Sequence, residues 1–328
     1  MSAARRPRRA EAQAEVQAPS QALIPGFEHR SVLLADTLAQ LAPRPGGRYL
    51  DGTLGGGGHA ELILENSGPD GILVGIDRDP AALRAAGERL TRFGDRARLL
   101  RGRFSEMAEL AAAHGPFDGV LLDIGTSSPQ LDHADRGFSF MHDGPLDMRM
   151  DPSTGESAAE LIDRLTEEAL ADVIYRYGEE PRSRRIAKAI VAGRPWTRTG
   201  ALAACVAEGS GWKASRTHPA TRTFQALRIA VNNELDELER ALPAAVSLLA
   251  PGGRLAVISF HSLEDRIVKG FLRTAAEIGT ARDAYGAPLS APALRLCTRR
   301  AIDGAEADPT NPRSRSARLR VAERLPTA

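Results

Sequence analysis

The sequence predicts an α/β fold in which helices alternate with the strands of a parallel sheet. Four strand-like segments occur before residue 124, each separated from the next by a helical or glycine-rich segment. The first ends in the turn Asp51-Gly-Thr-Leu-Gly-Gly-Gly-Gly-His59, and a helical pattern follows it. Strand, glycine turn and helix, in this order, open the doubly wound sheets that bind nucleotides. Helical patterns over residues 157–213 interrupt the alternation and predict an inserted helical domain.

The composition excludes several classes of protein. With 328 residues, 42% of them hydrophobic, the chain can form one large or two moderate domains. Two cysteines, Cys205 and Cys297, are too few for a disulfide framework and indicate a reducing compartment. No apolar run approaches the roughly 18 residues of a membrane span, so we expect a cytoplasmic protein with no membrane partner. The formal net charge of +1 gives no global basic field, although arginines cluster locally.

The N-terminal part leads into the first strand. Residues 1–25 are rich in Ala, Arg, Gln and Pro, which predicts a disordered basic arm. Apolar residues at helical spacing then predict a helix that ends near Leu41, before Pro43 and Pro45.

The glycine turn predicts a ligand site. Glycine lets the backbone turn tightly and lets a ligand approach the main chain. The N-terminus of the following helix offers unpaired N–H groups to that ligand. A flexible loop that binds nothing is the alternative. Gly55, Gly57 and Ala60 also match the pattern G-x-G-x-x-A, which leaves a dinucleotide open as the ligand.

The second strand, residues 71–76, ends in Asp77. An acid at this position holds the ribose diol of a nucleotide, and Asp77 follows the glycine turn at the expected distance of roughly 20 residues. Pro80 suits the first turn of a helix predicted for residues 81–93. A third strand, residues 98–101, precedes Phe104, which either stacks on a base or packs in the core.

The fourth strand, Phe117–Asp123, ends in Asp123-Ile-Gly-Thr-Ser-Ser-Pro-Gln-Leu-Asp132. Ligands of parallel sheets bind beyond the carboxyl ends of the strands. We therefore expect the glycine turn, Asp77, Asp123 and Gln130 to surround one crevice. Residues 136–151 lack periodicity but interleave apolar with polar side chains, which predicts a long ordered loop of functional type.

The rest of the chain predicts the insertion and the second half of the sheet. Capping residues Ser157, Thr166 and Thr199 each open a helix of the insertion, and a strongly basic helix spans residues 182–191. Residues 224–242 predict one long amphipathic helix, and residues 254–260 a fifth strand. The sequence thus divides into a core, residues 26–135 and 217–328, and a loop with helical insertion, residues 136–216, which we expect to serve substrate recognition. Two terminal strands flank a basic loop, residues 311–318.

The residues at the strand ends are typical of a methyltransferase that uses S-adenosylmethionine. A turn with Asp and Ser-Pro after the fourth strand presents acceptors to an amino group that is methylated. The expected tetrapeptide has two prolines and an aromatic residue, and the sequence from Ser128 to Leu131 departs from it. The residues alone therefore indicate an amine methyltransferase without naming its substrate.

Longer motifs are similar to those of one family. The chain resembles the bacterial 16S rRNA (cytosine-N(4))-methyltransferase family (RsmH, formerly MraW) from residue 29 to residue 320. Ile124 and Thr126 replace the usual Leu and Val, which is conservative, and residues 1–25 lie outside the resemblance. The motifs that carry the resemblance are His29-x-Ser-Val-Leu-Leu, the glycine turn, Asp123 to Asp132, Arg136-Gly-Phe-Ser-Phe, Asp143-Gly-Pro-Leu-Asp-Met-Arg-Met-Asp151, Tyr177-Gly-Glu-Glu, Thr217-His-Pro-Ala-Thr-Arg-Thr-Phe-Gln-Ala-Leu-Arg228, Ile258-Ser-Phe-His-Ser-Leu-Glu-Asp-Arg-Ile-Val268 and Asn311-Pro-Arg-Ser-Arg315.

The resemblance implies a Rossmann-like methyltransferase sheet and transfer of a methyl group from S-adenosylmethionine to the exocyclic amine of a cytosine. The implied partner is the decoding region of 16S rRNA in the small ribosomal subunit. The cofactor residues that carry over are Gly57, Gly58, His59, Asp77, Phe104, Asp123 and Gln130.

Catalytic and RNA-binding candidates follow from the same motifs. Asp123 and Ser128 offer acceptors to the amine, and Asp147 is a further candidate. For each RNA candidate, a phosphate contact and an internal salt bridge are both open. These candidates are Arg136, Arg149, His218, Arg222, Arg228, His261, Arg313 and Arg315.

Several alternatives stay open. We expect no metal site, because the histidines show no H-x-x-x-H pattern and the cysteines no C-x-x-C pattern. Both cysteines are expected to be buried packing residues. A dinucleotide oxidoreductase and a non-catalytic RNA-binding protein are the rival functions. A homodimer is compatible with the sequence.

Overall fold

The computed structural model describes residues 31–211, 218–276, 285 and 292–326. The predicted basic arm, residues 1–25, lies outside the described residues, and so does His29. No helix within the described ranges is both long and apolar enough to cross a membrane.

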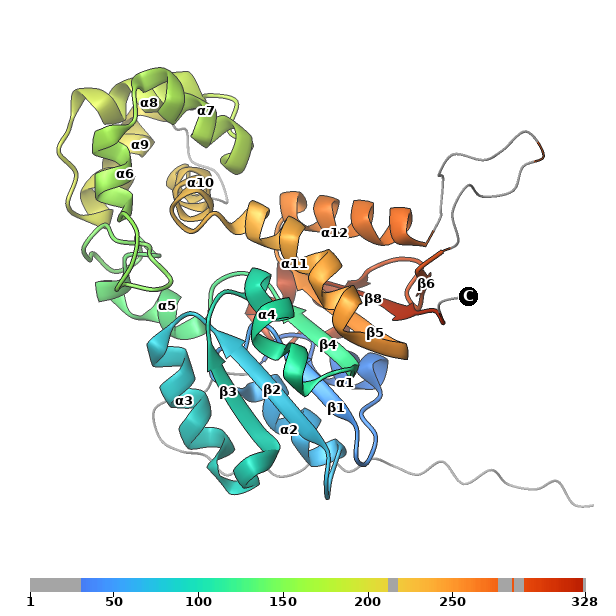
Figure 1. Cartoon of the computed structure of the whole chain (residues 1–328). Coiled ribbons are helices and arrows are strands. Elements are labelled where there is room, and N and C mark those ends of the chain that lie inside the picture. Colours follow the sequence, from blue (N-terminus) through green and yellow to red (C-terminus); the bar gives the residue numbers. More distant parts are fainter. Residues whose placement is uncertain (1–30, 212–217, 277–284, 286–291, 327–328) are drawn as a thin grey trace, which may run out of the picture.

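A single sheet forms the centre of the molecule (Figure 1), in the order β3-β2-β1-β4-β5-β8-β6, with β7 paired to β8. The first five strands run parallel, whereas β8 runs antiparallel to its neighbours β5, β6 and β7. The predicted α/β fold class is confirmed. The strands are β1 (Arg48–Asp51), β2 (Ile72–Asp77), β3 (Ala97–Arg101), β4 (Phe117–Asp123), β5 (Leu249–Ser259), β6 (Leu294–Leu296), β7 (Ile302–Asp303) and β8 (Arg318–Arg324).

Helices cover both faces of this sheet. The core helices are α1 (Leu34–Leu41), α2 (Gly58–Asn66), α3 (Pro80–Leu90), α4 (Met107–Ala111), α5 (Ser128–Asp132), α11 (Glu234–Leu248), α12 (Ser262–Ala275) and α13 (Gly304–Ala307). Short 3-10 turns span Thr91–Arg96, Phe104–Glu106, Ala112–His114, Ala134–Arg136 and Pro312–Ser316.

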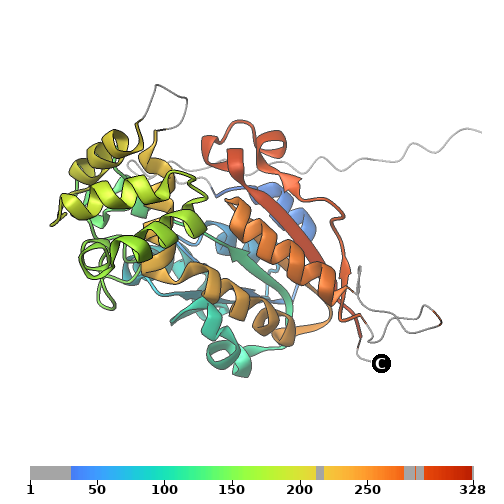
Figure 2. The ribbon, with the colours of Figure 1, turned by 90° about the horizontal axis from the view of Figure 1, so that it is seen from above.

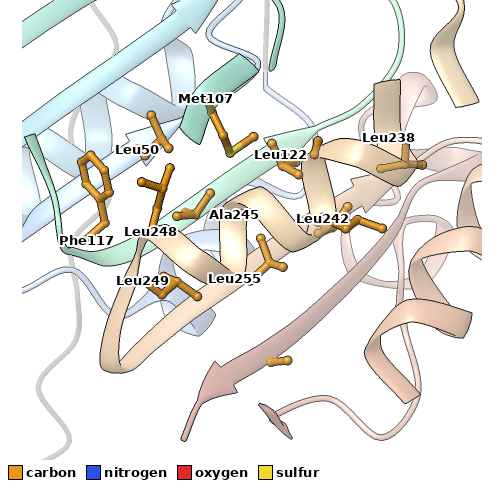
Figure 3. Packing of buried hydrophobic residues seen from close by; sticks show 14 of the residues in the cluster. Leu50, Met107, Phe117, Leu122, Leu238, Leu242, Ala245, Leu248, Leu249 and Leu255 are labelled. Carbon is orange, nitrogen blue, oxygen red and sulfur yellow. The ribbon is translucent and has the colours of Figure 1, made fainter. Parts of the chain in front are cut away.

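Alternate residues of the central strands enter two separate hydrophobic clusters. Leu50 and Leu122 pack with α4, α11 and α12 on one face (Figure 3). Tyr49 and Leu121 pack with α1, α2 and α3 on the other. Because side chains alternate along a strand, a strand buried on both faces is apolar throughout. This explains why the strands read as continuous apolar runs in the sequence.

The helical insertion forms a third cluster at one end of the molecule (Figures 1 and 2). Its helices are α6 (Ala158–Arg164), α7 (Glu167–Gly178), α8 (Ser183–Ala192) and α9 (Thr199–Ser210). Helix α10 (Ala220–Asn232) also buries Phe224 and Leu227 in this cluster. The segment that we placed in the core thus begins with a helix that packs on the insertion.

Three local predictions were wrong. The amphipathic pattern over residues 224–242 belongs to two helices, because Asn233 adopts a left-handed conformation with φ of 52° and separates α10 from α11. Thr199 does not cap α9, because its hydroxyl accepts a hydrogen bond from the Gly144 amide at 3.0 Å instead. Cys297 is exposed rather than buried, and Cys205 is half-buried.

Candidate active site

The glycine turn is fastened to both strands that flank β1. The Leu54 amide donates to the Ile76 carbonyl on β2 at 3.0 Å, and the Gly52 amide donates to the Leu121 carbonyl on β4 at 2.9 Å. The turn therefore lies where the strand order reverses, with β2 on one side of β1 and β4 on the other. This is the point at which doubly wound sheets open a crevice for their ligand.

Two glycines of the turn are required by its geometry. Gly57 has φ of 78°, which side chains rarely tolerate. A Cβ atom on Gly58 would come within 2.2 Å of the Ser31 hydroxyl. The turn is thus a tight, ordered structure, which disfavours the flexible loop that the sequence left as an alternative.

Asp77 ends β2 and braces the glycine turn. One carboxylate oxygen accepts the Gly55 amide at 2.8 Å, and the other accepts the Asp79 amide at 2.8 Å. Burial raises the pKa of Asp77, and these two amide hydrogen bonds oppose that rise. Each carboxylate oxygen has two lone pairs, so Asp77 could still accept from a ribose hydroxyl.

Three acidic residues end neighbouring strands: Asp51 on β1, Asp77 on β2 and Asp123 on β4. Burial raises the pKa of Asp51 to about 7. The amide hydrogen bond from Thr53 lowers this pKa, and the charge of Asp77 raises it further. Burial and the charges of Asp51 and Glu264 raise the pKa of Asp123 well above its ordinary value. The crevice therefore gathers more carboxylates than it can keep ionised, and a cationic ligand would be stabilised there.

Asp123 has an unused acceptor. Its side chain is 23% exposed, and its Oδ1 atom is buried without a hydrogen-bond partner among the described residues. The Asp123 amide donates to the Thr53 hydroxyl oxygen at 2.6 Å, which ties the end of β4 to the glycine turn. A buried acceptor without a donor is costly unless a ligand supplies one.

His59 lies beside this carboxylate. Its Nδ1 atom is 3.7 Å from Asp123 Oδ2, and its Nε2 atom is 3.1 Å from the Val32 carbonyl. Since a carbonyl only accepts, Nε2 carries a proton. The Nδ1 atom of His59 thus faces the Asp123 carboxylate at a distance longer than a hydrogen bond.

Asp79, which the sequence analysis did not single out, connects three parts of the site. It is 2% exposed and caps α3 through the Ala81 amide at 2.9 Å. Its other oxygen accepts Gln130 Nε2 at 3.1 Å and Arg136 Nη1 at 2.8 Å. The signal was present, because an Asp directly before Pro80 is a typical N-cap.

Three other predicted site residues are buried or half-buried. Phe104 is half-buried against the core cluster of α4 and α11. Ser128 is 5% exposed in the first turn of α5. Gln130 is equally buried, and its Oε1 atom accepts the Ser127 amide at 3.0 Å. Both ends of the Gln130 amide group are therefore engaged within the protein.

Asp147 is held in a close ion pair. Arg149 donates to it from Nε at 2.9 Å and from Nη2 at 2.7 Å. Burial raises the pKa of Asp147, but the hydrogen bonds and charge of Arg149 outweigh burial and lower it. An ionised carboxylate in a bidentate pair is a weak proton acceptor, so the geometry favours Asp123 over Asp147 as an available acceptor.

Comparison with known proteins decides the family. The model of the MraW methylase family matches residues 26–325. The chain belongs to the MraW methylase family.

Individual relatives agree with this assignment. The ribosomal RNA small subunit methyltransferase H of Trichlorobacter lovleyi is 55% identical over 91% of this chain and 99% of its own length. The protein of the same name from Geobacter sulfurreducens is 53% identical over the same shares. A solved S-adenosylmethionine-dependent O-methyltransferase from Thermotoga maritima is 10% identical, covers 90% of this chain and 65% of its own, and has a TM-score of 0.38. That likeness is too distant to add to the argument.

In this MraW-family chain, three of the predicted RNA-binding arginines are largely buried in internal ion pairs. Arg136 also donates to the Arg149 and Met150 carbonyls and is 16% exposed. Arg149 pairs with Asp147. Arg228 binds both oxygens of Glu234 at 2.8 Å. For these three, the structure shows the salt bridge that the sequence left as the alternative.

The remaining candidates lie nearer the surface. Arg222 is 54% exposed and 3.6 Å from Glu180. Arg313 is 38% exposed and donates to both oxygens of Asp132 at 2.8 Å. Arg315 is exposed, His218 is half-buried against Phe140, and His261 caps α12.

One group of side chains could be read as a metal site. The ligand atoms of Glu234, His261 and Glu264 lie within 4.8 Å of one another. Arg228 already neutralises Glu234, and its Nη2 atom is 4.0 Å from Glu264. A metal ion would have to displace this guanidinium, so the absence of a metal stays our prediction.

Proposed function

We propose that this methylase transfers the methyl group of S-adenosylmethionine to the exocyclic amine of a cytosine in the decoding region of 16S rRNA. The unused acceptor of Asp123, set at the crevice beside the glycine turn, is the observation that supports this most. An amine donor fits a buried carboxylate oxygen that lacks a partner. The methyl sulfonium of the cofactor supplies the reactive group.

The cofactor site is proposed from residues that already surround the crevice. Gly57, Gly58 and His59 would hold the methionine part at the N-terminus of α2. Asp77 would accept from the ribose, and Phe104 would lie against the base. Gln130 would shape the wall, because its own hydrogen bonds fix it to Asp79 and Ser127.

The chemical step requires positioning more than covalent work. A cytosine amine is a poor nucleophile, because its lone pair is delocalised into the ring. Asp123 and Ser128 would hold this amine in line with the donor, and such alignment can account for much of the rate. The base would leave its stack to reach them. A positive charge on the bound donor would favour the ionised form of Asp123, since a cationic neighbour lowers a raised carboxyl pKa. The ionised carboxylate would accept a hydrogen bond from the amine and then the proton that the methylated nitrogen releases.

The location, the RNA contacts and the oligomeric state of the protein are also proposals. We propose the cytoplasm as the location and the 16S rRNA of the small ribosomal subunit as the partner. Arg222, Arg313, Arg315, His218 and His261 are the proposed RNA contacts. A homodimer is a further proposal, which sedimentation of the purified protein would test.

A methyl-transfer assay tests the function. Purified protein, labelled S-adenosylmethionine and either small subunits or free 16S rRNA should give N4-methylcytidine on nucleoside analysis. Calorimetric titration with S-adenosylmethionine separates the rivals, because a non-catalytic RNA-binding protein would not bind it. A dinucleotide retained by the purified protein, with no methyl transfer, would support the oxidoreductase instead.

A further inference from the structure

The helical insertion contains a pocket whose residues are far along the chain from the glycine turn. It has a volume of about 610 Å³ and lies between the last turns of α7 and the first turn of α8. Figure 1 shows α8 on the side of the helical group that faces away from the sheet. The residues that matter below are Tyr175, Arg182, Arg184 and Arg185, all of which line it.

Tyr175 presents an aromatic ring to solvent at this pocket. Its side chain is 61% exposed, which is unusual for a large aromatic residue on a helix that packs its other face in a core. The helix α7 buries Leu170 and Ile174 in the insertion instead. Tyr175 therefore contributes little to the hydrophobic cluster and offers a free π-face.

The three arginines carry positive charge that the described part of the chain does not neutralise. No carboxylate among the described residues lies within 4.0 Å of Arg182, Arg184 or Arg185, and all three are exposed. Arg185 lies against Gly211, which follows α9. Arg182 directly precedes α8, and Arg184 lies in its first turn. The whole chain has a formal net charge of only +1, so this is a local concentration of charge.

Contacts of Glu180 hold the segment that carries these arginines in place. Glu180 is 9% exposed and accepts the Arg182 amide at 3.0 Å. It also lies 3.6 Å from Arg222 of α10, and the Ser183 amide donates to its carbonyl at 3.1 Å. The pocket is thus built on a fixed turn.

We propose that this pocket binds single-stranded RNA, with a base stacked on Tyr175 and phosphates held by Arg182 and Arg184. Unpaired bases stack on aromatic side chains, and guanidinium groups bind phosphate in two-pronged fashion. The apolar side chains of the lining are Tyr175, Ala171 and Pro181, which disfavours the apolar centre of a protein–protein interface. Its one carboxylate, Asp172, lies 3.8 Å from Arg176, so the three arginines of the lining keep it positive. The inference rests on the proposed function, and it names a site on the substrate side that is distinct from the crevice.

The test uses the full chain and a labelled single-stranded RNA of about 12 nucleotides, within the usual range of site sizes. Tyr175→Leu should weaken binding by about tenfold, whereas Tyr175→Phe, which keeps the ring, should stay within about twofold. Arg182→Gln with Arg184→Gln should lower the slope of log affinity against log salt by up to about two. Arg273→Gln is the matched control, because it removes an exposed arginine near the end of α12.

Several results would overturn the pocket. One is an unchanged RNA affinity in both Tyr175→Leu and the arginine double variant. The others are a loss of RNA affinity in Tyr175→Phe as large as in Tyr175→Leu, or a loss in Arg273→Gln as large as in the arginine double variant. Capture of a protein in place of RNA by wild type but not by Tyr175→Leu would also do so.

Methyl transfer separates this inference from the proposed function. If wild type methylates small subunits while the variants keep the wild-type KM, the pocket fails and the function stands. If wild type transfers no methyl group, the function fails whatever the RNA-binding result. The expected result is a raised KM for the RNA with unchanged affinity for S-adenosylmethionine.

Discussion

At the scale of single residues, Asp77 serves the protein's own backbone as well as the proposed ribose. Its two oxygens hold the Gly55 and Asp79 amides. Asp77→Asn should therefore keep more of the turn than Asp77→Ala while it removes the charge. A charged hydrogen bond contributes roughly 1.5–3 kcal/mol. Calorimetry of either Asp77 variant should therefore show that its affinity for S-adenosylmethionine has fallen about tenfold or more. Asp118→Asn, in an exposed pair with Arg44 at the amino end of β4, is the control. Unchanged affinity in a folded Asp77 variant would remove this residue from the cofactor site.

Asp51 gives the stability a predictable pH dependence. Its pKa is raised to about 7, chiefly by burial, whereas an unfolded aspartate titrates near 3.9. The folded state thus holds the proton more tightly, and the stability from this group is present at low pH and lost as pH rises from about 4 to about 7. Asp51→Asn should remove that loss and raise the free energy of unfolding at pH 8 by at most about 4 kcal/mol. Urea unfolding at pH 5 and pH 8 checks this, and an unaltered pH dependence would contradict it.

At the scale of elements, the strands and the glycine turn could be predicted because local pattern determines them. The fourth strand matches the structure at both ends, since Phe117 and residues 119–122 are buried in an apolar run. The break at Asn233 could not be predicted from apolar spacing, because the pattern continues through it. What separates α10 from α11 is the backbone conformation of one residue.

This break should tolerate glycine and resist a β-branched residue. Glycine adopts a positive φ at no steric cost, whereas valine there would add strain of about 1–3 kcal/mol. Asn233→Gly is expected to unfold near the wild-type urea concentration, and Asn233→Val at a clearly lower one. Equal midpoints for the two variants would show that the left-handed turn is not required.

The basic segment at residues 312–316 is a 3-10 turn in which the two arginines differ. Arg313 is paired with Asp132, whereas Arg315 has no carboxylate partner within the described residues. Arg315→Ala should lower the salt slope of RNA binding by about one, and Arg313→Ala by less. Fluorescence titration at several salt concentrations measures both, with cofactor affinity as the quantity that should stay constant. A collapse of cofactor affinity would instead place this turn at the donor pocket.

At the scale of the whole molecule, the topology brings together residues that are far apart in the sequence. The strand ends predicted the crevice residues and the resemblance implied the same ones, but neither could show that Asp147 and Arg136 are used internally. Such pairings depend on how the loop, residues 136–151, folds over α3 and α10. Asp79 was missed for the same reason, because its partners Gln130 and Arg136 come from later elements.

The same topology bears on which cytosine atom receives the methyl group. Methylation of the ring carbon needs a cysteine nucleophile in the crevice, because that carbon is not nucleophilic enough alone. Cys205 lies in α9 of the insertion, and Cys297 follows β6 at the edge of the sheet. Desolvation raises the pKa of both thiols, although Cys297 is exposed at the surface, so neither is a ready thiolate. Changing both residues to Ser should therefore leave methyl transfer largely intact, with at most a modest loss of thermal stability. Nucleoside analysis should place the methyl group on the exocyclic nitrogen. A 5-methylcytosine product, or loss of turnover in a double variant with a wild-type unfolding profile, would rule out the proposal that Asp123 holds an amine for methylation.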